Sequence, residues 1–143
     1  MSGFLLDTNV ISELVKPKPE RLVITWIEAT DEALLHLSVL TLGEIRRGVA
    51  SLRHARRRAI LEAWIETDLR TRFHGRVLPI DEDVANRWGW LTAQAQKKGI
   101  VLPVIDGLLA ATALQHNLTF ATRDTGSLAD SGVAVFNPWD EVS

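Results

Sequence analysis

Short apolar runs alternate along this chain with longer segments of helical periodicity, and no other feature limits the fold as strongly. A strand of a parallel sheet is buried on both faces, so it reads as a short continuous apolar run. The pattern predicts strands over residues 3–6, 34–39, 77–80, 118–122 and 133–136. Helices are predicted after Asp7, over 21–30, from Thr41, over 53–68, from Asp81 to 99 and over 105–116. This alternation predicts an α/β protein, a sandwich with helices around a mostly parallel central sheet.

Three of the predicted helices have apolar residues at core spacing. In the segment 53–68 these are Ile60, Leu61, Trp64, Ile65 and Leu69. In the segment 21–30 they are Leu22, Trp26 and Ala29, and after Asp81 they are Val84, Trp88, Leu91 and Ala95. We therefore expect Trp26, Trp64 and Trp88 in the core, and Trp90 at an interface.

The composition is that of an ordinary soluble protein, with 46% hydrophobic and 24% charged residues among 143. This length predicts a single domain, 1–143. The chain has no cysteine, which excludes a disulfide framework and a thiolate metal site. Asp7 interrupts the start before a signal-peptide core could form, and no apolar run approaches the roughly 20 residues of a membrane span. We expect a cytoplasmic protein that does not enter membranes.

Four carboxylates stand where an apolar element ends or a helix begins: Asp7, Glu44, Asp106 and Asp124. The carboxyl ends of the strands in an open parallel sheet line a common crevice, so residues distant in sequence can meet there. Two carboxylates about 4 Å apart repel by about 4 kcal/mol at an effective dielectric near 20, so such a cluster holds either protons or a cation. A donor set of oxygens favours Mg²⁺ or Mn²⁺ over zinc. Such an ion activates water for attack on phosphate without a histidine base.

Each carboxylate also has a purely structural explanation. Asp7 and Asp106 could cap the helices that follow them, and Asp124 could form a turn. The pattern Thr41-x-x-Glu44 is that of a capping box. Asp7 and Asp106 nevertheless follow strongly apolar residues, with no lysine or arginine beside them to neutralise a buried charge. A cation is the natural partner of both.

Polar and basic neighbours of these acids are further candidates. Thr8, Asn9 and Thr122 could orient carboxylates, metal waters or phosphate, or serve as ordinary helix caps. The net charge is only −2, but nine arginines lie between Arg46 and Arg76. This stripe is either a solvated helix face or a phosphate-binding surface. The candidates for phosphate contact are Arg46, Arg47, Arg56, Arg57 and Arg123.

Four motifs in a fixed order carry a resemblance to a known family. They are Leu5-Leu6-Asp7-Thr8-Asn9, Gly-Glu-Ile-Arg-Arg-Gly at 43–48, Ile-Asp-Gly-Leu-Leu-Ala-Ala-Thr-Ala at 105–113, and Ala-Thr-Arg-Asp at 121–124. Together they resemble PIN-domain ribonucleases, and the closing Phe136-Asn137-Pro138-Trp139 resembles toxins of the VapC/FitB type. The resemblance implies a PIN-like α/β/α sandwich and a Mg²⁺- or Mn²⁺-dependent endoribonuclease of a type II toxin-antitoxin system.

The same resemblance assigns Asp7 and Asp106 as the main metal ligands, with Glu44 and Asp124 completing the site. It also implies a homodimer and a small antitoxin protein that places an arginine or lysine against the acids. Val10, Leu14 and Trp26 are the candidate antitoxin contacts.

Other functions remain open for this sequence. One is an RNA-processing PIN nuclease that is not a toxin, and another is an inactive RNA- or protein-binding module of the same fold. A phosphoaspartyl transferase with Asp7 as nucleophile is disfavoured, because that chemistry generally uses a second acid two residues on, where this chain has Asn9.

Overall fold

In the computed structural model, which describes residues 2–128 and 131–140, five strands form one parallel sheet in the order β3-β2-β1-β4-β5. The strands are β1 (Phe4–Leu6), β2 (Leu35–Ser38), β3 (Val77–Leu78), β4 (Thr119–Ala121) and β5 (Val135–Phe136). Strand β1 is central, and its residue Leu5 lies opposite His36 of β2 and Phe120 of β4. The predicted α/β class is confirmed, and each pair of strands among the described residues is parallel.

Each strand is shorter than its predicted run. Leu34 belongs to a short 3-10 helix, η1 (Glu32–Leu34), and Val39 is already the first residue of a helix, so β2 loses a residue at each end. Strand β3 stops before Pro79, which has no N–H to donate to a neighbouring strand. Runs of apolar residues therefore locate the strands, whereas helix starts and proline set where they end.

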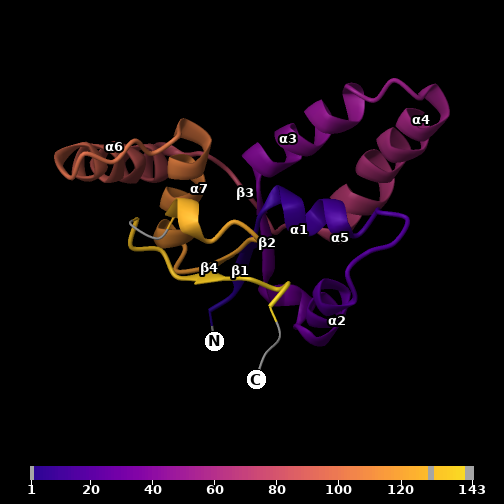
Figure 1. The fold of residues 1–143 in the computed structure, drawn as a ribbon, viewed down its shortest axis with the longest axis horizontal. Coiled ribbons are helices and arrows are strands. Elements are labelled where there is room, and N and C mark those ends of the chain that lie inside the picture. The colour runs from indigo at the N-terminus through magenta and orange to yellow at the C-terminus, as the bar shows by residue number, and fades with distance from the viewer. Residues whose placement is uncertain (1, 129–130, 141–143) are drawn as a thin grey trace.

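Helices cover both faces of the sheet (Figure 1). On one side lie α1 (Thr8–Glu13), α2 (Arg21–Ala29), α3 (Val39–Ala50), α4 (Ala55–Trp64) and α5 (Arg70–Arg72), and on the other lie α6 (Glu82–Lys97) and α7 (Val104–Gln115). Successive side chains of a strand point to opposite faces. Leu6 accordingly packs in the core under α1 to α4, and Leu5 packs in the core under α6 and α7. The β1 strand thus joins two hydrophobic cores.

The inward face of α2 differs from the prediction. Val23 and Ile27 are buried, whereas Leu22 and Ala29 are exposed. Trp26, expected in the core, is only half-buried and packs against the edge of the core, with its ring centroid 5.0 Å from that of Phe4. The helix is rotated relative to the predicted face because the pair Val23 and Ile27, four residues apart, forms the stripe that meets the core.

Helix α4 continues through a π-helical turn, η2 (Ile65–Leu69), into α5, so the helical segment runs beyond its predicted end. Leu61, Ile65 and Leu69 are buried at intervals of four residues, as predicted. Ile60 was predicted to be buried as well and is instead 54% exposed. The buried stripe is one residue wide here, and Ile60 lies beside it, on the surface.

Helix α6 agrees with its predicted signals. The Asp81 side chain caps it by accepting a hydrogen bond from the Val84 backbone N–H, and Gly99 follows its end with a φ of 73°. Trp88 is half-buried and Trp90 is exposed. Among the described residues, no helix is both long enough and apolar enough to cross a membrane.

The backbone at Gly3 approaches Leu34 closely, because a Cβ at this position would lie 2.2 Å from the carbonyl oxygen of Leu34. We expect Gly3→Ala to lower the free energy of unfolding by about 1–3 kcal/mol. Gly89→Ala in α6 is the matched control, since a Cβ there meets nothing within 4 Å. The control should be neutral or more stable by about 0.5–1 kcal/mol. Urea unfolding measures both, and a Gly3→Ala variant as stable as the parent would contradict the close approach.

Candidate functional site

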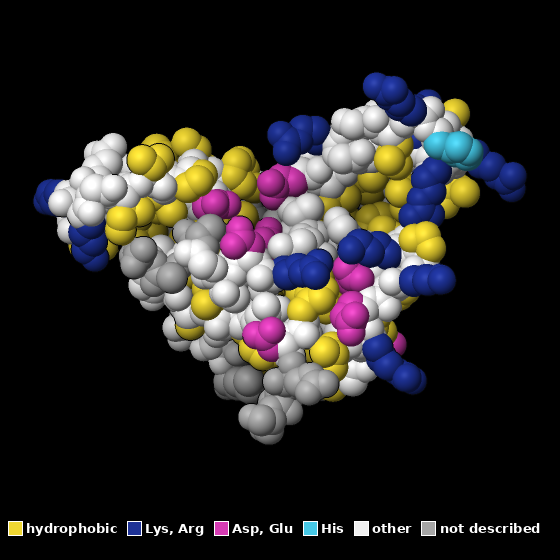
Figure 2. Space-filling model, in the orientation of Figure 1, with side chains coloured by type: hydrophobic (Ala, Val, Ile, Leu, Met, Phe, Trp, Pro, Cys, Tyr) yellow, Lys and Arg dark blue, Asp and Glu magenta, His cyan; other side chains and the backbone are white. Residues whose placement is uncertain are grey.

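The four predicted acids come from elements that end or begin at the carboxyl edge of the sheet. Asp7 directly follows β1, and Asp124 follows β4. Glu44 lies on α3, which begins where β2 ends, and Asp106 lies in the first turn of α7. Helix α6 and the α3–α4 pair diverge above this edge (Figure 1), and acidic side chains gather on the surface between these two arms (Figure 2).

Asp7 is held by hydrogen bonds from two sides. Its Oδ1 accepts from the backbone N–H of Thr8 at 2.7 Å, so it caps α1 as the structural explanation predicts. Its Oδ2 accepts from the Thr122 hydroxyl, also at 2.7 Å, and from the Asn9 amide at 3.4 Å. Because Thr122 is fully buried after β4, this bond joins the ends of the two central strands. The same carboxylate therefore caps α1 and forms part of the candidate site.

Glu44 is joined to the same network through Thr8, whose hydroxyl donates to the Glu44 Oε1 at 2.7 Å. The predicted capping box is wrong, because α3 begins at Val39 and its cap is Ser38. The Ser38 hydroxyl oxygen accepts from the Leu40 backbone N–H at 3.0 Å. Glu44 therefore lies within the helix, where its side chain is not needed for capping.

Asp106 also lies inside its helix. Helix α7 begins at Val104, with Pro103 at the cap position, so the capping explanation for Asp106 is wrong. Asp124 is exposed, and its backbone N–H donates to the Thr122 hydroxyl oxygen at 3.1 Å. Thr122 is thus the residue that connects the turn at Asp124 to the carboxylate of Asp7.

The pKa values of two of these carboxylates are raised, in part by the charges of the neighbouring acids. Desolvation raises the pKa of Asp7, and the charges of Glu44 and Asp106 raise it further, against the hydrogen bonds from Thr122 and Thr8. Desolvation likewise raises the pKa of Asp106, with the charges of Asp124 and Glu44 adding to it. Asp7 and Asp106 are the two acids whose ionised forms most need a positive partner.

The donor set suits a hydrated hard cation. Within residues 2–128 and 131–140, no group of three or more Asp, Glu or His side chains is close enough to hold one ion directly. Mg²⁺ is usually bound in proteins through one or two carboxylates and keeps several of its waters, and all-oxygen donors also suit Mn²⁺.

The arginine stripe is divided by the structure. Arg46 forms an ion pair with Glu66 of η2, and Arg72 and Arg76 both pair with Glu32. Arg57 donates to the backbone carbonyl of Val15 at 2.8 Å. Three exposed arginines of the stripe form no ion pair among the described residues: Arg47, Arg53 and Arg56. These three lie on α3, on the connection that follows it and on α4, along one of the two arms.

A groove that the sequence analysis missed begins at the site. It is a hollow of about 260 Å³ between α1, α3 and α4, and its walls include Thr8, Glu44, Ile45, Val49 and Trp64. Ile45, Val49 and Leu52 follow Glu44 at helical spacing, and this pattern was the available signal.

The predicted contacts Val10 and Trp26 do not line this groove. Val10 is fully buried, so its proposed contact with a partner protein is wrong. Trp26 packs against Phe4 and Phe136.

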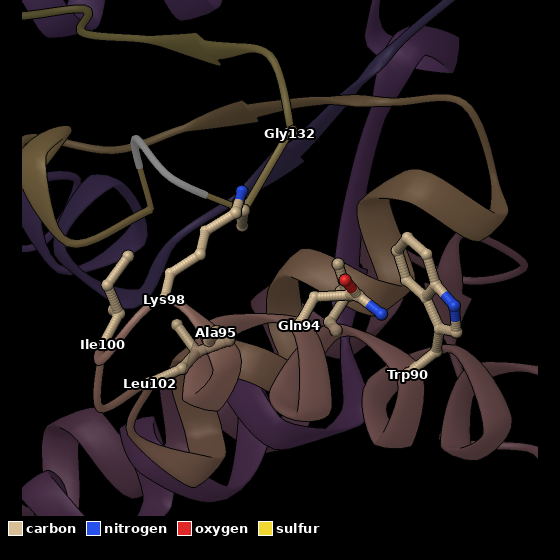
Figure 3. A pocket seen from close by; sticks show the side chains of 9 residues that line it. Trp90, Gln94, Ala95, Lys98, Ile100, Leu102 and Gly132 are labelled. Atoms are coloured by element: carbon tan, nitrogen blue, oxygen red, sulfur yellow. The ribbon is translucent and has the colours of Figure 1, made fainter.

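A second hollow lies at the far end of α6 (Figure 3). It measures about 280 Å³ and is lined by Trp90, Leu91, Gln94, Ala95, Lys98, Ile100, Leu102, Ser131 and Gly132. Lys98 is the charged side chain of this set, and none of the carboxylates in the described part of the chain lines the hollow. It is therefore separate from the candidate site.

Known proteins are similar to this chain in sequence and in fold. The PIN domain family profile matches residues 4–130, which contain all four motifs noted above. Toxin FitB of Neisseria gonorrhoeae is 43% identical over 137 residues, 96% of this chain and 99% of its own length. The VapC ribonuclease Y4jK of Sinorhizobium fredii is 42% identical over 136 residues, 95% of this chain and 97% of its own. The crystal structure of FitAcB from Neisseria gonorrhoeae has a TM-score of 0.91 at 43% identity, covering 95% of this chain and 98% of that one.

The charge balance of the site predicts a pH-dependent effect of Asp106→Asn. Because the pKa of Asp106 is raised, the folded protein binds more protons than the unfolded chain above about pH 4, the ordinary Asp value, and stability falls as the pH rises. The asparagine variant lacks this loss. In a chelator, its melting temperature should therefore increase relative to that of the parent from about pH 4 upward.

Asp83→Asn, in the first turn of α6, is the matched control for the loss of a charge near a helix start. It should show no such gain. If Asp106→Asn is less stable than the parent at every pH, attraction to the helix dipole outweighs repulsion within the site.

Proposed function

The chain belongs to the PIN domain family, as its motifs predict, and from this premise we propose that it is the ribonuclease toxin of a type II toxin-antitoxin system. The observation that carries the proposal is the group of carboxylates at the carboxyl edge of the sheet, in which burial and neighbouring acids raise the pKa values of Asp7 and Asp106. The names of the relatives, a toxin and a VapC ribonuclease, support it.

Asp7 and Asp106 would hold Mg²⁺ or Mn²⁺. When bound, such an ion lowers the pKa of water and stabilises negative charge on the attacking and leaving oxygens of a phosphodiester. The Thr8 hydroxyl is oriented by the hydrogen bond that it donates to Glu44. The Asp7 carboxylate is oriented by the hydrogen bonds that Thr122 and Asn9 donate to it. Asp124 adds negative charge opposite Asp106. Water would attack phosphorus in line with the 3′ oxygen, the bond between phosphorus and that oxygen would break, and the proton lost by the water would pass through solvent to the leaving oxygen.

RNA would lie between the two arms, with its phosphates near the unpaired arginines of α3, of α4 and of the connection between them. Positive charge on one wall offsets the repulsion between the RNA backbone and the acidic floor. Arg47, Arg53 and Arg56 are the arginines available for this role, whereas Arg46, Arg72 and Arg76 are held in ion pairs.

An antitoxin segment would occupy the groove between α1, α3 and α4. Its apolar side chains would pack on Ile45, Val49 and Trp64, and an arginine at its end would reach Glu44. We also propose that the toxin forms a homodimer, and we keep its single-domain organisation and cytoplasmic location as predictions. An RNA-processing nuclease without an antitoxin is the main alternative, and an inactive module is the other.

RNA cleavage should depend on the acids more than RNA binding does. Asp7→Ala and Asp106→Ala should each lower turnover by about a hundredfold or more, because even residues that only support metal ligands contribute about 10–100-fold. RNA affinity should be largely retained. Glu28→Ala, at an exposed acid of α2, is the control and should cleave like the parent. Cleavage by the Asp106→Ala variant at the parent rate in Mg²⁺ would refute the assigned site.

The unpaired arginines should act on binding in a salt-dependent way. Replacing Arg53 and Arg56 with alanine should weaken RNA binding and flatten the dependence of log affinity on log salt by about 0.7 for each phosphate that is no longer neutralised. Arg57→Ala should add less, because its guanidinium already donates to Val15. Arg87→Ala, on α6, is the control. Equal salt slopes for the double variant and the parent would remove this arm from the RNA-binding surface.

Antitoxin control can be tested in cells. Expression of the chain alone should stop growth, and co-expression with the product of the adjacent small reading frame should restore it and yield a complex. Gly48→Glu, at an exposed position of the groove wall where a Cβ meets nothing within 4 Å, should abolish the rescue while toxicity persists. Normal growth in every case, with RNA cleavage in vitro intact, would favour the RNA-processing alternative.

A further inference from the structure

The closing motif Phe136-Asn137-Pro138-Trp139 has no part in the carboxylate site as described so far. Strand β5 ends at Phe136, whose carbonyl oxygen accepts from the Thr122 backbone N–H at 2.9 Å. The chain therefore leaves the sheet beside the segment that carries Thr122 and Asp124. Residues 137–140 form a turn at this point, which we call the C-terminal turn.

The C-terminal turn is internally fixed and anchored to the core. The Trp139 backbone N–H donates to the Asn137 Oδ1 at 2.9 Å, and the Asp140 N–H donates to the Asn137 carbonyl oxygen at 3.2 Å. Pro138 is buried, and Trp139 is half-buried against the core under α1 to α4. The turn is thus held by its own hydrogen bonds and by packing against the core.

Arg123 connects the C-terminal turn to the site. Its guanidinium carbon lies 5.4 Å from the centroid of the Trp139 ring, in cation–π geometry. Its backbone carbonyl accepts from the Asn137 amide at 3.5 Å, and its backbone N–H donates to the Asn9 Oδ1 at 3.4 Å. Two long hydrogen bonds therefore hold the Arg123 backbone, while its side chain stacks on Trp139.

Electrostatics agree with this placement of the Arg123 side chain. Burial raises the pKa of the Glu13 carboxyl, but hydrogen bonds from Lys16 and from the Glu20 backbone outweigh it, and the net shift is downward. The positive charge of Arg123 contributes to the lowering. The guanidinium that stacks on Trp139 thus also has an electrostatic influence on Glu13 of α1.

The neighbours of Arg123 in sequence both belong to the site. Thr122 donates to Asp7 at 2.7 Å and accepts from the Asp124 backbone N–H at 3.1 Å. Thr122 and Asp124 are bonded to Arg123 through the backbone, so a shift of the Arg123 backbone would shift them as well. Contacts made outside the site can in this way affect the alignment of Asp7 and Asp124.

We propose that Trp139 and Asn137 are positioning residues of the carboxylate site, which act through the backbone of residues 122–124 and touch neither RNA nor metal. This inference rests on the proposed metal-dependent ribonuclease function. It gives the closing motif a role in setting metal affinity and turnover.

The test compares Trp139→Leu, which removes the ring face, with Trp139→Phe, which retains one. Three quantities are measured: the Mn²⁺ dissociation constant without RNA, kcat and KM for RNA cleavage, and the melting temperature. Trp139→Leu should weaken Mn²⁺ binding by about tenfold, the lower end of the effect of residues that support metal ligands, and lower kcat with KM unchanged. Trp139→Phe should stay near the parent in both. Trp90→Leu removes an exposed tryptophan of α6 and is the matched control, expected to match the parent.

A lower melting temperature of Trp139→Leu with unchanged Mn²⁺ affinity and kcat would overturn the proposal, since Trp139 would then be only a packing residue. A higher KM with unchanged kcat would also overturn it, because the ring would then contact RNA. A parent protein that neither binds Mn²⁺ nor cleaves RNA would refute the proposed function itself. If Trp139→Leu does not fold, Asn137→Ser replaces it, since serine keeps an oxygen for the turn but is too short to reach Arg123. Parent-like Mn²⁺ affinity of that variant would overturn the proposal.

Discussion

The parallel pairing of β1 with both β2 and β4 is the constraint on which the rest of the structure depends. It buries Leu5 and Leu6 on opposite faces of the sheet, so one short strand belongs to two hydrophobic cores. It also sets the height at which β1 ends, and hence where Asp7 stands relative to Thr122 beyond β4. A shift of the β1–β4 register would turn side chains to the wrong face and separate this pair.

The acidic site has an electrostatic cost that the fold must offset. Desolvation and mutual repulsion act against ionisation of Asp7 and Asp106, while the hydrogen bonds to Asp7 act in favour of it. Sites with such opposed influences are frequent where a protein binds an ion or carries out chemistry. In this chain the offsetting donors are the Thr8 backbone and the Thr122 hydroxyl, so the capping of α1 and the alignment of the site are a single arrangement.

Several arginines of the stripe are paired with acids that lie outside the candidate site. Arg46, Arg72 and Arg76 are engaged by Glu66 and Glu32, and the ion pairs tie helices to their neighbours. Exposed pairs of this kind contribute little to stability. The arginines of the stripe that form no ion pair lie along one arm, and the apolar groove begins beside Glu44.

The sequence alone determined the α/β class, the identity of the four acids and the family, because strand burial and motif order are local patterns. A local pattern gave a wrong prediction where one residue fitted two explanations. Thr41 and Glu44 match a capping box, yet Ser38 caps the helix and Glu44 accepts a hydrogen bond from Thr8. The buried side of α2, the exposure of Ile60 and the groove beside Glu44 were likewise decided by tertiary packing. The links from Asp7 through Thr122 and Arg123 to Trp139 join residues far apart in the chain, and only the sheet brings them together.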